Sequence, residues 1–184
     1  MANYARHLVS CWDMSTINPP DLGWKGNGND GVGTGLVAAT DIVEGVAGSK
    51  ATRYNGTDEK TSMGDIGTIR TVSLWAYLDT TTEEIFKTAA GRDVMANAGT
   101  ITYAGVAADA TYVDGVVGTT VGVNFWHHIT CVFNDDEAAD SFELATDGAN
   151  FGALTIDTVR IYSAVLTLLQ VRDLYECTRK GILR

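Results

Sequence analysis

The most constraining feature of this sequence is a change of period near its C-terminal end. Residues 159–162 alternate between apolar and polar side chains, which is the two-residue period of a β-strand. A few residues later, Leu168, Val171 and Leu174 recur at helical spacing. The sequence therefore predicts a strand that is followed by one short helix.

Two residues mark the start of this helix. Thr167 precedes the helical pattern, where its hydroxyl can accept a hydrogen bond from a backbone amide of the first turn. Gln170 stands three residues later, where its side chain can reach back to the amide of Thr167. A capped single helix at the end of a Gly-rich chain with few other helical patterns favours a β-sandwich against which this helix packs.

The rest of the chain consists of short alternating segments joined by turns. The two clearest strands are predicted at residues 69–78 and 124–133. Asp114 and Gly115 predict a hairpin turn, because both residues tolerate a positive φ. Shorter runs predict strands at residues 8–13, 35–39, 52–56, 85–87, 101–103, 111–113 and 141–145, and an acidic loop at residues 135–140.

Many short strands with a single late helix predict an all-β antiparallel sandwich, with residues 1–184 as one domain. The length of 184 residues and the hydrophobic content of 45% suffice for a substantial core. The chain has 20 glycines and only 2 prolines without a collagen-like period, which indicates tight turns rather than disorder.

Composition also excludes some classes of partner. The net charge of −10 argues against binding to a nucleic-acid backbone. No segment approaches the roughly 18 consecutive apolar residues of a membrane span, and the N-terminus lacks an apolar signal core. Cys11, Cys131 and Cys177 have no metal-binding spacing and cannot all pair, so a reducing compartment fits best. We expect the chain to be made in the cytoplasm of a cell, which is a host cell under the viral hypothesis given below, without a signal peptide. We expect no nucleic-acid or membrane partner.

Several segments resemble a known family. They are residues 8–13 followed by 26–31, then residues 54–58, 71–75 and 126–130, and the closing residues 156–162 and 166–175. Together they resemble a concanavalin A-like jelly roll of the laminin-G and pentraxin type. The resemblance implies two apposed antiparallel sheets whose first and last strands are neighbours. It says less about function, because such domains serve as lectins, adhesion modules, enzymes and viral structural proteins.

Related domains often hold a structural calcium ion in loops near one edge, and calcium prefers oxygen ligands. The residues of this chain that lie in the matching segments and carry such oxygens are Asn29, Asp30, Asp58 and Asp157. The resemblance therefore implies these four residues as candidate calcium ligands. The alternative is that they cap turns, which is a common role of Asn and Asp.

Carbohydrate binding is the second chemistry that the sequence allows. Trp75 and Tyr77 lie on one face of the strand predicted at residues 69–78, where their rings could stack on sugars. Thr71 and Ser73 share that face and could supply hydrogen bonds. The alternative is that this face is buried in the core.

An enzymatic role is not expected. The glucanases that the fold resembles carry Glu-x-Asp-x-Glu on one strand, and glycoside hydrolysis needs two carboxylates beside the bond. Asp135 and Glu137 come nearest to such a pair, but no apolar alternation surrounds them. The adjacent His127 and His128 would point to opposite faces of a strand and cannot grip one metal ion together.

The main functional hypothesis is a non-enzymatic structural protein of a phage virion, either a capsid decoration or a tail component. Such a protein would dock on other virion proteins and on copies of itself. Its docking elements are predicted to be residues 2–8 and the basic tail, which carries Arg179, Lys180 and Arg184. A merely solvated tail is the alternative. The alternative function is a lectin-like adhesion module that binds cell-surface glycans.

Overall fold

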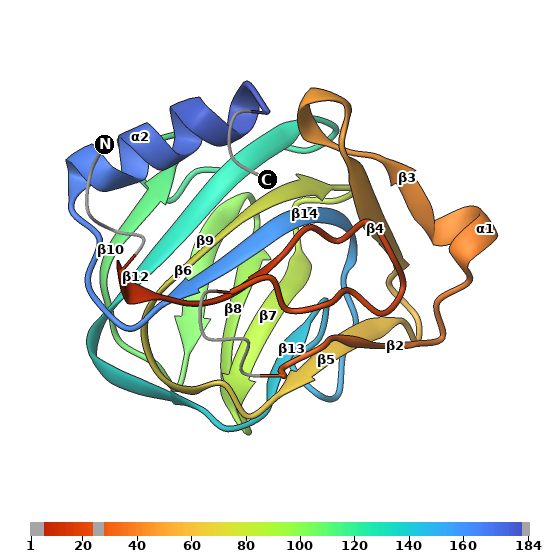
Figure 1. Cartoon of the computed structure of the whole chain (residues 1–184), viewed down its shortest axis with the longest axis horizontal. Coiled ribbons are helices and arrows are strands. Elements are labelled where there is room, and N and C mark those ends of the chain that lie inside the picture. The colour runs from red at the N-terminus through yellow and green to blue at the C-terminus, as the bar shows by residue number, and fades with distance from the viewer. Residues whose placement is uncertain (1–5, 24–27, 182–184) are drawn as a thin grey trace.

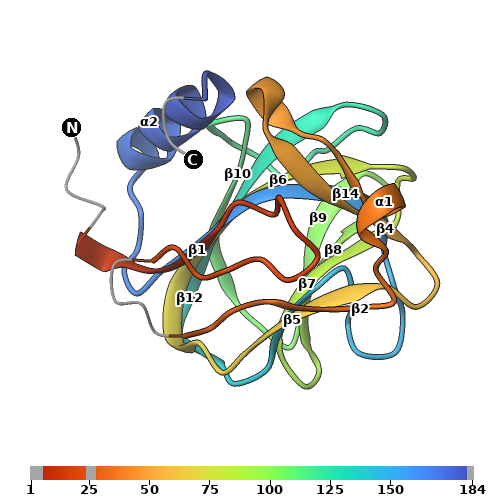
Figure 2. The ribbon, with the colours of Figure 1, turned by 45° about the vertical axis from the view of Figure 1, so that its right-hand side comes forward.

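The computed structural model of the chain describes residues 6–23 and 28–181. Two antiparallel sheets lie face to face and enclose the core (Figures 1 and 2). One helix of 12 residues follows the last strand and lies against the larger sheet (Figure 1). The prediction of an antiparallel β-sandwich with a short C-terminal helix is therefore confirmed.

The larger sheet contains eight of the strands that the structure describes. Their order is β11–β10–β12–β6–β14–β4–β3, and β1 also pairs with β14. In chain order these strands are β1 (Leu8–Trp12), β3 (Ile42–Glu44), β4 (Lys50–Asn55), β6 (Gly67–Leu78), β10 (Ala108–Val113), β11 (Val116–Val117), β12 (Trp126–Ala139) and β14 (Ala153–Tyr162).

The smaller sheet contains six described strands in the order β2–β5–β13–β7–β8–β9. They are β2 (Val32–Thr34), β5 (Lys60–Gly64), β7 (Glu83–Ala89), β8 (Arg92–Asn97), β9 (Thr100–Ala104) and β13 (Phe142–Leu144). The helical segments are α1 (Ala38–Asp41), the 3₁₀ turn η2 (Val46–Gly48) and α2 (Leu168–Arg179). No helix among the described residues is long and apolar enough to cross a membrane.

Strand β6 occupies the centre of the larger sheet, between β12 and β14. Its apolar residues face the smaller sheet and are buried in the core; they are Val72, Leu74, Ala76 and Leu78. Between the sheets, the Phe86 and Phe142 rings stack with centroids 5.5 Å apart. Trp12 is fully buried in the same core cluster, and its indole nitrogen donates to the Asn29 carbonyl at 2.9 Å. Each large side chain buried in this way contributes roughly 1.5–3 kcal/mol.

The first and last strands pair as predicted. In the register of β1 and β14, Leu8 stands opposite Tyr162 and Trp12 opposite Val159. The hairpin at Asp114 and Gly115 is also confirmed: it joins β10 to β11, with φ of 54° and 76° at the two turn residues. The hairpin follows from a local signal, whereas the pairing of β1 with β14 joins the two ends of the chain.

Three expectations about strands need correction. The strand predicted at residues 35–39 is not formed, because β2 ends at Thr34 and α1 begins at Ala38. The acidic segment at residues 135–140 is not a loop, because β12 continues through it to Ala139 beside β6, after an irregularity that begins at Val132. Strand β8 was not predicted from the sequence at all. Its signal is weak, because Arg92 and Asp93 interrupt the apolar pattern after the turn at Gly91.

Helix α2 begins where the sequence predicts. Thr167 and Gln170 form a capping box, in which the Thr167 amide donates to Gln170 Oε1 at 2.8 Å and the Gln170 amide donates to Thr167 Oγ1 at 3.4 Å. The helix lies on the outer face of the larger sheet, the face turned away from the smaller sheet. There Val171 and Leu174 are fully buried in a second apolar cluster with Tyr112, Val132, Tyr162 and Leu166.

Polar groups also join α2 to the sheet. The Trp75 indole nitrogen donates to the Thr178 hydroxyl at 2.9 Å. The His128 ring lies against both Trp75 and Tyr175, with centroid distances of 5.1 and 5.8 Å. His128 Nε2 shares a hydrogen bond with Ser73 Oγ at 2.9 Å. Burial lowers the pKa of His128 from 6.5 to about 3; the charge of Arg160 lowers it further, while that of Asp114 opposes the shift.

The buried face of α2 yields a first prediction. Leu174→Ala should lower the free energy of unfolding by about 2–5 kcal/mol, because it removes a fully buried side chain from the cluster between helix and sheet. The matched control is Leu169→Ala in the same helix, where the side chain is 72% exposed and the change should stay within about 0.5 kcal/mol. Urea unfolding measures both. Equal effects of the two substitutions would contradict the observed docking of α2.

The buried imidazole yields a second prediction. Because the pKa of His128 is lower in the folded than in the unfolded chain, its contribution to stability is complete above pH 6.5 and is lost as the pH falls toward about 3. Within that window, the free energy of unfolding should fall by up to about 1.4 kcal/mol for each pH unit of acidification. His128→Phe should remove this part of the slope, whereas His7→Phe, at an exposed position, should keep it. Urea unfolding across the window compares the three proteins, and indistinguishable slopes would refute the assignment.

Candidate functional site

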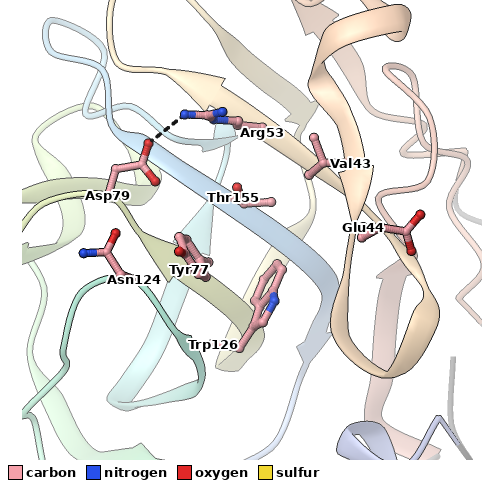
Figure 3. A pocket seen from close by; sticks show the side chains of 8 residues that line it. All are labelled: Val43, Glu44, Arg53, Tyr77, Asp79, Asn124, Trp126 and Thr155. Carbon is pink, nitrogen blue, oxygen red and sulfur yellow. Dashed lines mark hydrogen bonds and ion pairs between the residues drawn. The ribbon is translucent and has the colours of Figure 1, made fainter.

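Helix α2 covers only part of the outer face of the larger sheet. In Figure 1 it lies along β10 and β12, while β3, β4 and α1 stand at the opposite side. Between them the outer face is open and forms a pocket of about 440 Å³. The lining residues come from five strands and the adjoining loops, and Figure 3 shows them all: Val43, Glu44, Arg53, Tyr77, Asp79, Asn124, Trp126 and Thr155.

Two aromatic rings from neighbouring strands form the floor of this pocket. Tyr77 of β6 stands directly opposite Trp126 of β12 in the sheet register. Their ring centroids are 5.8 Å apart at an interplanar angle of 65°, and both side chains are half-buried. Thr155 of β14 stands opposite Tyr77 on its other side. The floor therefore consists of two partly exposed aromatic rings on β6 and β12, with Thr155 beside them on β14 (Figure 3).

Polar side chains form the rim. Arg53 on β4 makes an ion pair with Asp79, which follows β6, with Nη2 3.2 Å from Oδ2. Glu44 on β3 lines the pocket and pairs with Lys50 across the β3–β4 hairpin. Asn124 adopts a φ of 65°, a left-handed conformation that Asn tolerates better than most residues. Its backbone N–H donates to the Leu78 carbonyl at 2.9 Å. The rim thus combines carboxylate, amide and guanidinium groups around an aromatic floor.

The wall formed by β3 depends on a buried carboxylate outside the pocket. Asp157 on β14 accepts a hydrogen bond from the amide of Val46 at 2.9 Å, one from the hydroxyl of Ser49 and one from the hydroxyl of Thr158 at 2.9 Å. The first two donors belong to the loop between β3 and β4. Burial raises the pKa of Asp157, while these donors act in the opposite direction. The carboxylate therefore fixes the β3–β4 loop against the sheet.

The four residues predicted to bind sugars divide between the pocket and the interface beneath α2. Tyr77 lines the pocket, whereas Trp75, Thr71 and Ser73 are at most 4% exposed. Besides the contact of Trp75 with Thr178, the Thr71 hydroxyl donates to the Ala164 carbonyl at 2.9 Å. Trp75 and Thr71 therefore hold the C-terminal segment, Ser73 is bonded to His128 and Thr130 of β12, and all three are buried in this structure.

The pocket also contains residues that the sequence analysis did not select. Alternation along the strand indicates that Trp126 and His128 lie on the same face. The position of Trp126 beside Tyr77, however, follows only from the pairing of β12 with β6. Arg53 and Asp79 lie 26 positions apart in the sequence. No local pattern connects them.

The four predicted calcium ligands do not converge. Asp157 is occupied by the donors described above. Asp30 accepts from the Asp21 amide at 2.9 Å, and the Asn29 side chain lies 3.4 Å from the Ser10 hydroxyl. Asp58 accepts from the Asn55 side chain at 3.1 Å in the turn after β4. The described residues contain no group of three or more Asp, Glu, His or Cys that could hold a metal ion.

Each of the four residues thus has a hydrogen-bond partner within the chain. Calcium binding stays a prediction, and lower thermal stability in a chelator would be its first support.

The basic residues of the tail make contacts within their own helix. Arg179 and Lys180 both pair with Glu176, at 2.9 and 3.0 Å, and all these side chains are exposed. Arg184 and residues 2–5 lie outside the described residues. Docking through these termini stays a prediction.

Of the two carboxylates nearest to a glycosidase pair, Asp135 and Glu137, the second has structural partners. Glu137 is 7% exposed; the Thr88 hydroxyl donates to it at 2.6 Å, and Arg92 pairs with it at 2.9 Å. Its neighbour Asp136 pairs with Arg70 at 3.4 Å. Glu137 therefore links β12 to the smaller sheet, on the side where β12 meets β7 and β8. This arrangement favours a structural role for Glu137.

Comparisons with known proteins place the fold but not a family. No protein-family model and no curated protein sequence matches the chain. Among solved structures, the fold is similar to domain 4 of AbnA, a GH43 extracellular arabinanase from Geobacillus stearothermophilus, in complex with arabinotriose. The TM-score is 0.58 and the identity 22%, over 92% of this chain and 98% of that domain.

Two further structures are similar over smaller shares of their length. The receptor binding domain of botulinum neurotoxin C/D mosaic serotype matches with a TM-score of 0.59 and 11% identity, over 94% of this chain and 51% of that one. Trypanosoma rangeli sialidase in complex with the inhibitor DANA matches with a TM-score of 0.59 and 9% identity, over 90% of this chain and 32% of that one. At these identities the likeness establishes a β-sandwich of the kind found in carbohydrate-binding and receptor-binding domains.

Proposed function

We propose that this chain is a non-enzymatic carbohydrate-binding module that holds a glycan in the pocket on the open half of the larger sheet. The observation that carries the proposal is the pair of partly exposed rings, Tyr77 and Trp126, on the floor of a hollow with a polar rim. Sugar rings present apolar C–H faces and hydroxyl edges. A site that takes them needs flat apolar surface and hydrogen-bonding groups together.

The geometry of the pocket suits this chemistry. The aromatic rings belong to paired strands rather than to loops, so a ligand would order few side chains on binding. Asp79 and Glu44 offer carboxylate acceptors, Arg53 offers donors, and Asn124 carries an amide that can do both. A sugar hydroxyl both donates and accepts, so a rim of mixed groups can bind it.

The solved structures support the same class of function. One of them is a domain with arabinotriose bound and another is a receptor binding domain. Glu137, one of the two carboxylates that come nearest to a glycosidase pair in the sequence, is held by Thr88 and Arg92, which favours binding over catalysis. The hypothesis of a phage virion component gains no support from these structures and stays a prediction. Detection of the chain in purified particles would test it.

The first test removes one aromatic ring. On a glycan array that includes arabino-oligosaccharides, the wild-type chain should bind at least one saccharide, and Trp126→Ala should weaken that binding by at least tenfold, which is about 1.4 kcal/mol. Phe125→Ala is the matched control. Its ring is also exposed but lies against His127, and Phe125 does not line the pocket.

Titration calorimetry with the saccharide found on the array gives the affinities, and thermal melting checks that both variants remain folded. Binding by Trp126→Ala that equals wild-type binding would refute the assignment of this pocket. A chain that binds no saccharide on the array would refute the proposed function.

A further inference from the structure

A second hollow adjoins the pocket at the edge of the larger sheet. It measures about 290 Å³ and is lined by residues of α1, of β4 and of the segments that follow β4 and β6. Its lining residues are Thr40, Asp41, Arg53, Tyr54, Asn55, Glu59 and Asp79. Arg53 and Asp79 line both hollows, so the ion pair between them stands at the junction.

We call the two hollows together the groove, because Arg53 and Asp79 line both. The Arg53 side chain is 55% exposed and that of Asp79 is 29% exposed, so the ion pair between the hollows is accessible from the surface. A ligand that fills the aromatic pocket and extends past this ion pair enters the second hollow. A ligand of one sugar unit on the aromatic floor would leave the second hollow unused.

The walls of the second hollow are fixed by the fold. Tyr54 is fully buried, and its hydroxyl lies 2.7 Å from that of Thr61. Glu59 is 6% exposed and accepts from the Asn55 amide at 2.6 Å. Asp41 accepts from the Val37 amide at 2.5 Å and thereby holds the turn of α1. The hollow therefore exists before any ligand arrives, which reduces the entropic cost of binding.

The charges of the groove select the chemical class of its ligand. Among the described residues that line either hollow there are four carboxylates, on Glu44, Asp41, Glu59 and Asp79, and one guanidinium, on Arg53. The guanidinium is already paired with Asp79, and Glu44 is paired with Lys50. An anionic sugar would therefore meet the carboxylates of Asp41 and Glu59 without an unpaired cation in the lining, and like charges brought together at a binding site are unfavourable. Hydroxyl groups, in contrast, can donate to these carboxylates.

We propose that the ligand is an uncharged oligosaccharide of two or more units, with one unit on the Tyr77–Trp126 floor and the next beyond the Arg53–Asp79 pair. This inference rests on the proposed function, because it assigns the ligand class of the same site. It adds a second subsite in the second hollow. It also excludes sugars that carry a carboxylate as preferred ligands.

The test compares chain length and charge. Calorimetry with arabino-, xylo- and gluco-oligosaccharides should show tighter binding of the disaccharide than of the monosaccharide within at least one series. Thr40→Phe should fill the second hollow, because Thr40 is an exposed residue that lines it. In this variant the disaccharide should bind at least tenfold more weakly, about 1.4 kcal/mol, while the affinity for the monosaccharide stays unchanged. Thr34→Phe, at an exposed position on β2 of the other sheet, is the control.

The outcomes separate this inference from the proposed function. If Trp126→Ala loses binding but Thr40→Phe binds disaccharides as the wild type does, the second subsite is refuted and the aromatic pocket stands. If sialyllactose binds more tightly than lactose, the uncharged class is refuted. If no saccharide binds the wild-type chain, or Trp126→Ala has no effect, the proposed function itself falls and the second subsite falls with it.

Discussion

The hydrogen bond from the Trp75 indole to the Thr178 hydroxyl ties the end of α2 to the centre of the larger sheet. Around it, the rings of His128 and Tyr175 and the buried side chains of Val171 and Leu174 form a continuous contact between helix and strands. Without this helix the outer face of β6 and β12 would expose an aromatic and polar strip along its whole length. The docking of α2 therefore determines which part of that strip a ligand can reach.

The strip itself is continuous along each strand. On β6 the outer face runs from Thr71 through Ser73 and Trp75 to Tyr77, and the partners on β12 follow the same alternation. Under α2 these residues hold the helix, and beyond its edge Tyr77 and Trp126 are half-exposed. The outer face of the larger sheet therefore supports α2 on one side of the helix edge and lines the pocket on the other side. The same residue types are structural on one side of that boundary and available for binding on the other.

The sequence predicts the fold well because most of its signals are local. The period of two at residues 69–78, the cap at Thr167 and the turn at Asp114 each depend on neighbours in the chain, and all three are confirmed. The pairing of the first and last strands followed from their apolar character, their lack of a hairpin partner and the resemblance to a jelly roll. Where charged residues interrupt the period, as in β8, the local signal fails.

The site was less predictable, because it depends on contacts between distant segments. Alternation placed Tyr77 and Trp75 on the same face, but it could not show that α2 buries Trp75 and spares Tyr77. Nor could it show that Arg53 meets Asp79, since their contact requires β4 and β6 to lie on either side of β14. The candidate calcium residues illustrate the same limit. Their type was suitable, but the fold directs each one to a separate backbone amide or side chain.

Asp157 is a buried group outside the pocket that supports one of its walls. Its carboxylate lies where β14 departs from regular pairing with β6, and the following residue, Thr158, has a φ of 45°. This irregular backbone turns the Asp157 side chain toward the β3–β4 loop, where the amide of Val46 and the hydroxyl of Ser49 donate to it. Because burial of a carboxylate is unfavourable without such donors, the loop and the irregularity stabilise each other. The strand β3 that this loop follows carries Val43 and Glu44 into the pocket, so the wall facing the aromatic floor depends on a hydrogen-bonded group that no ligand touches.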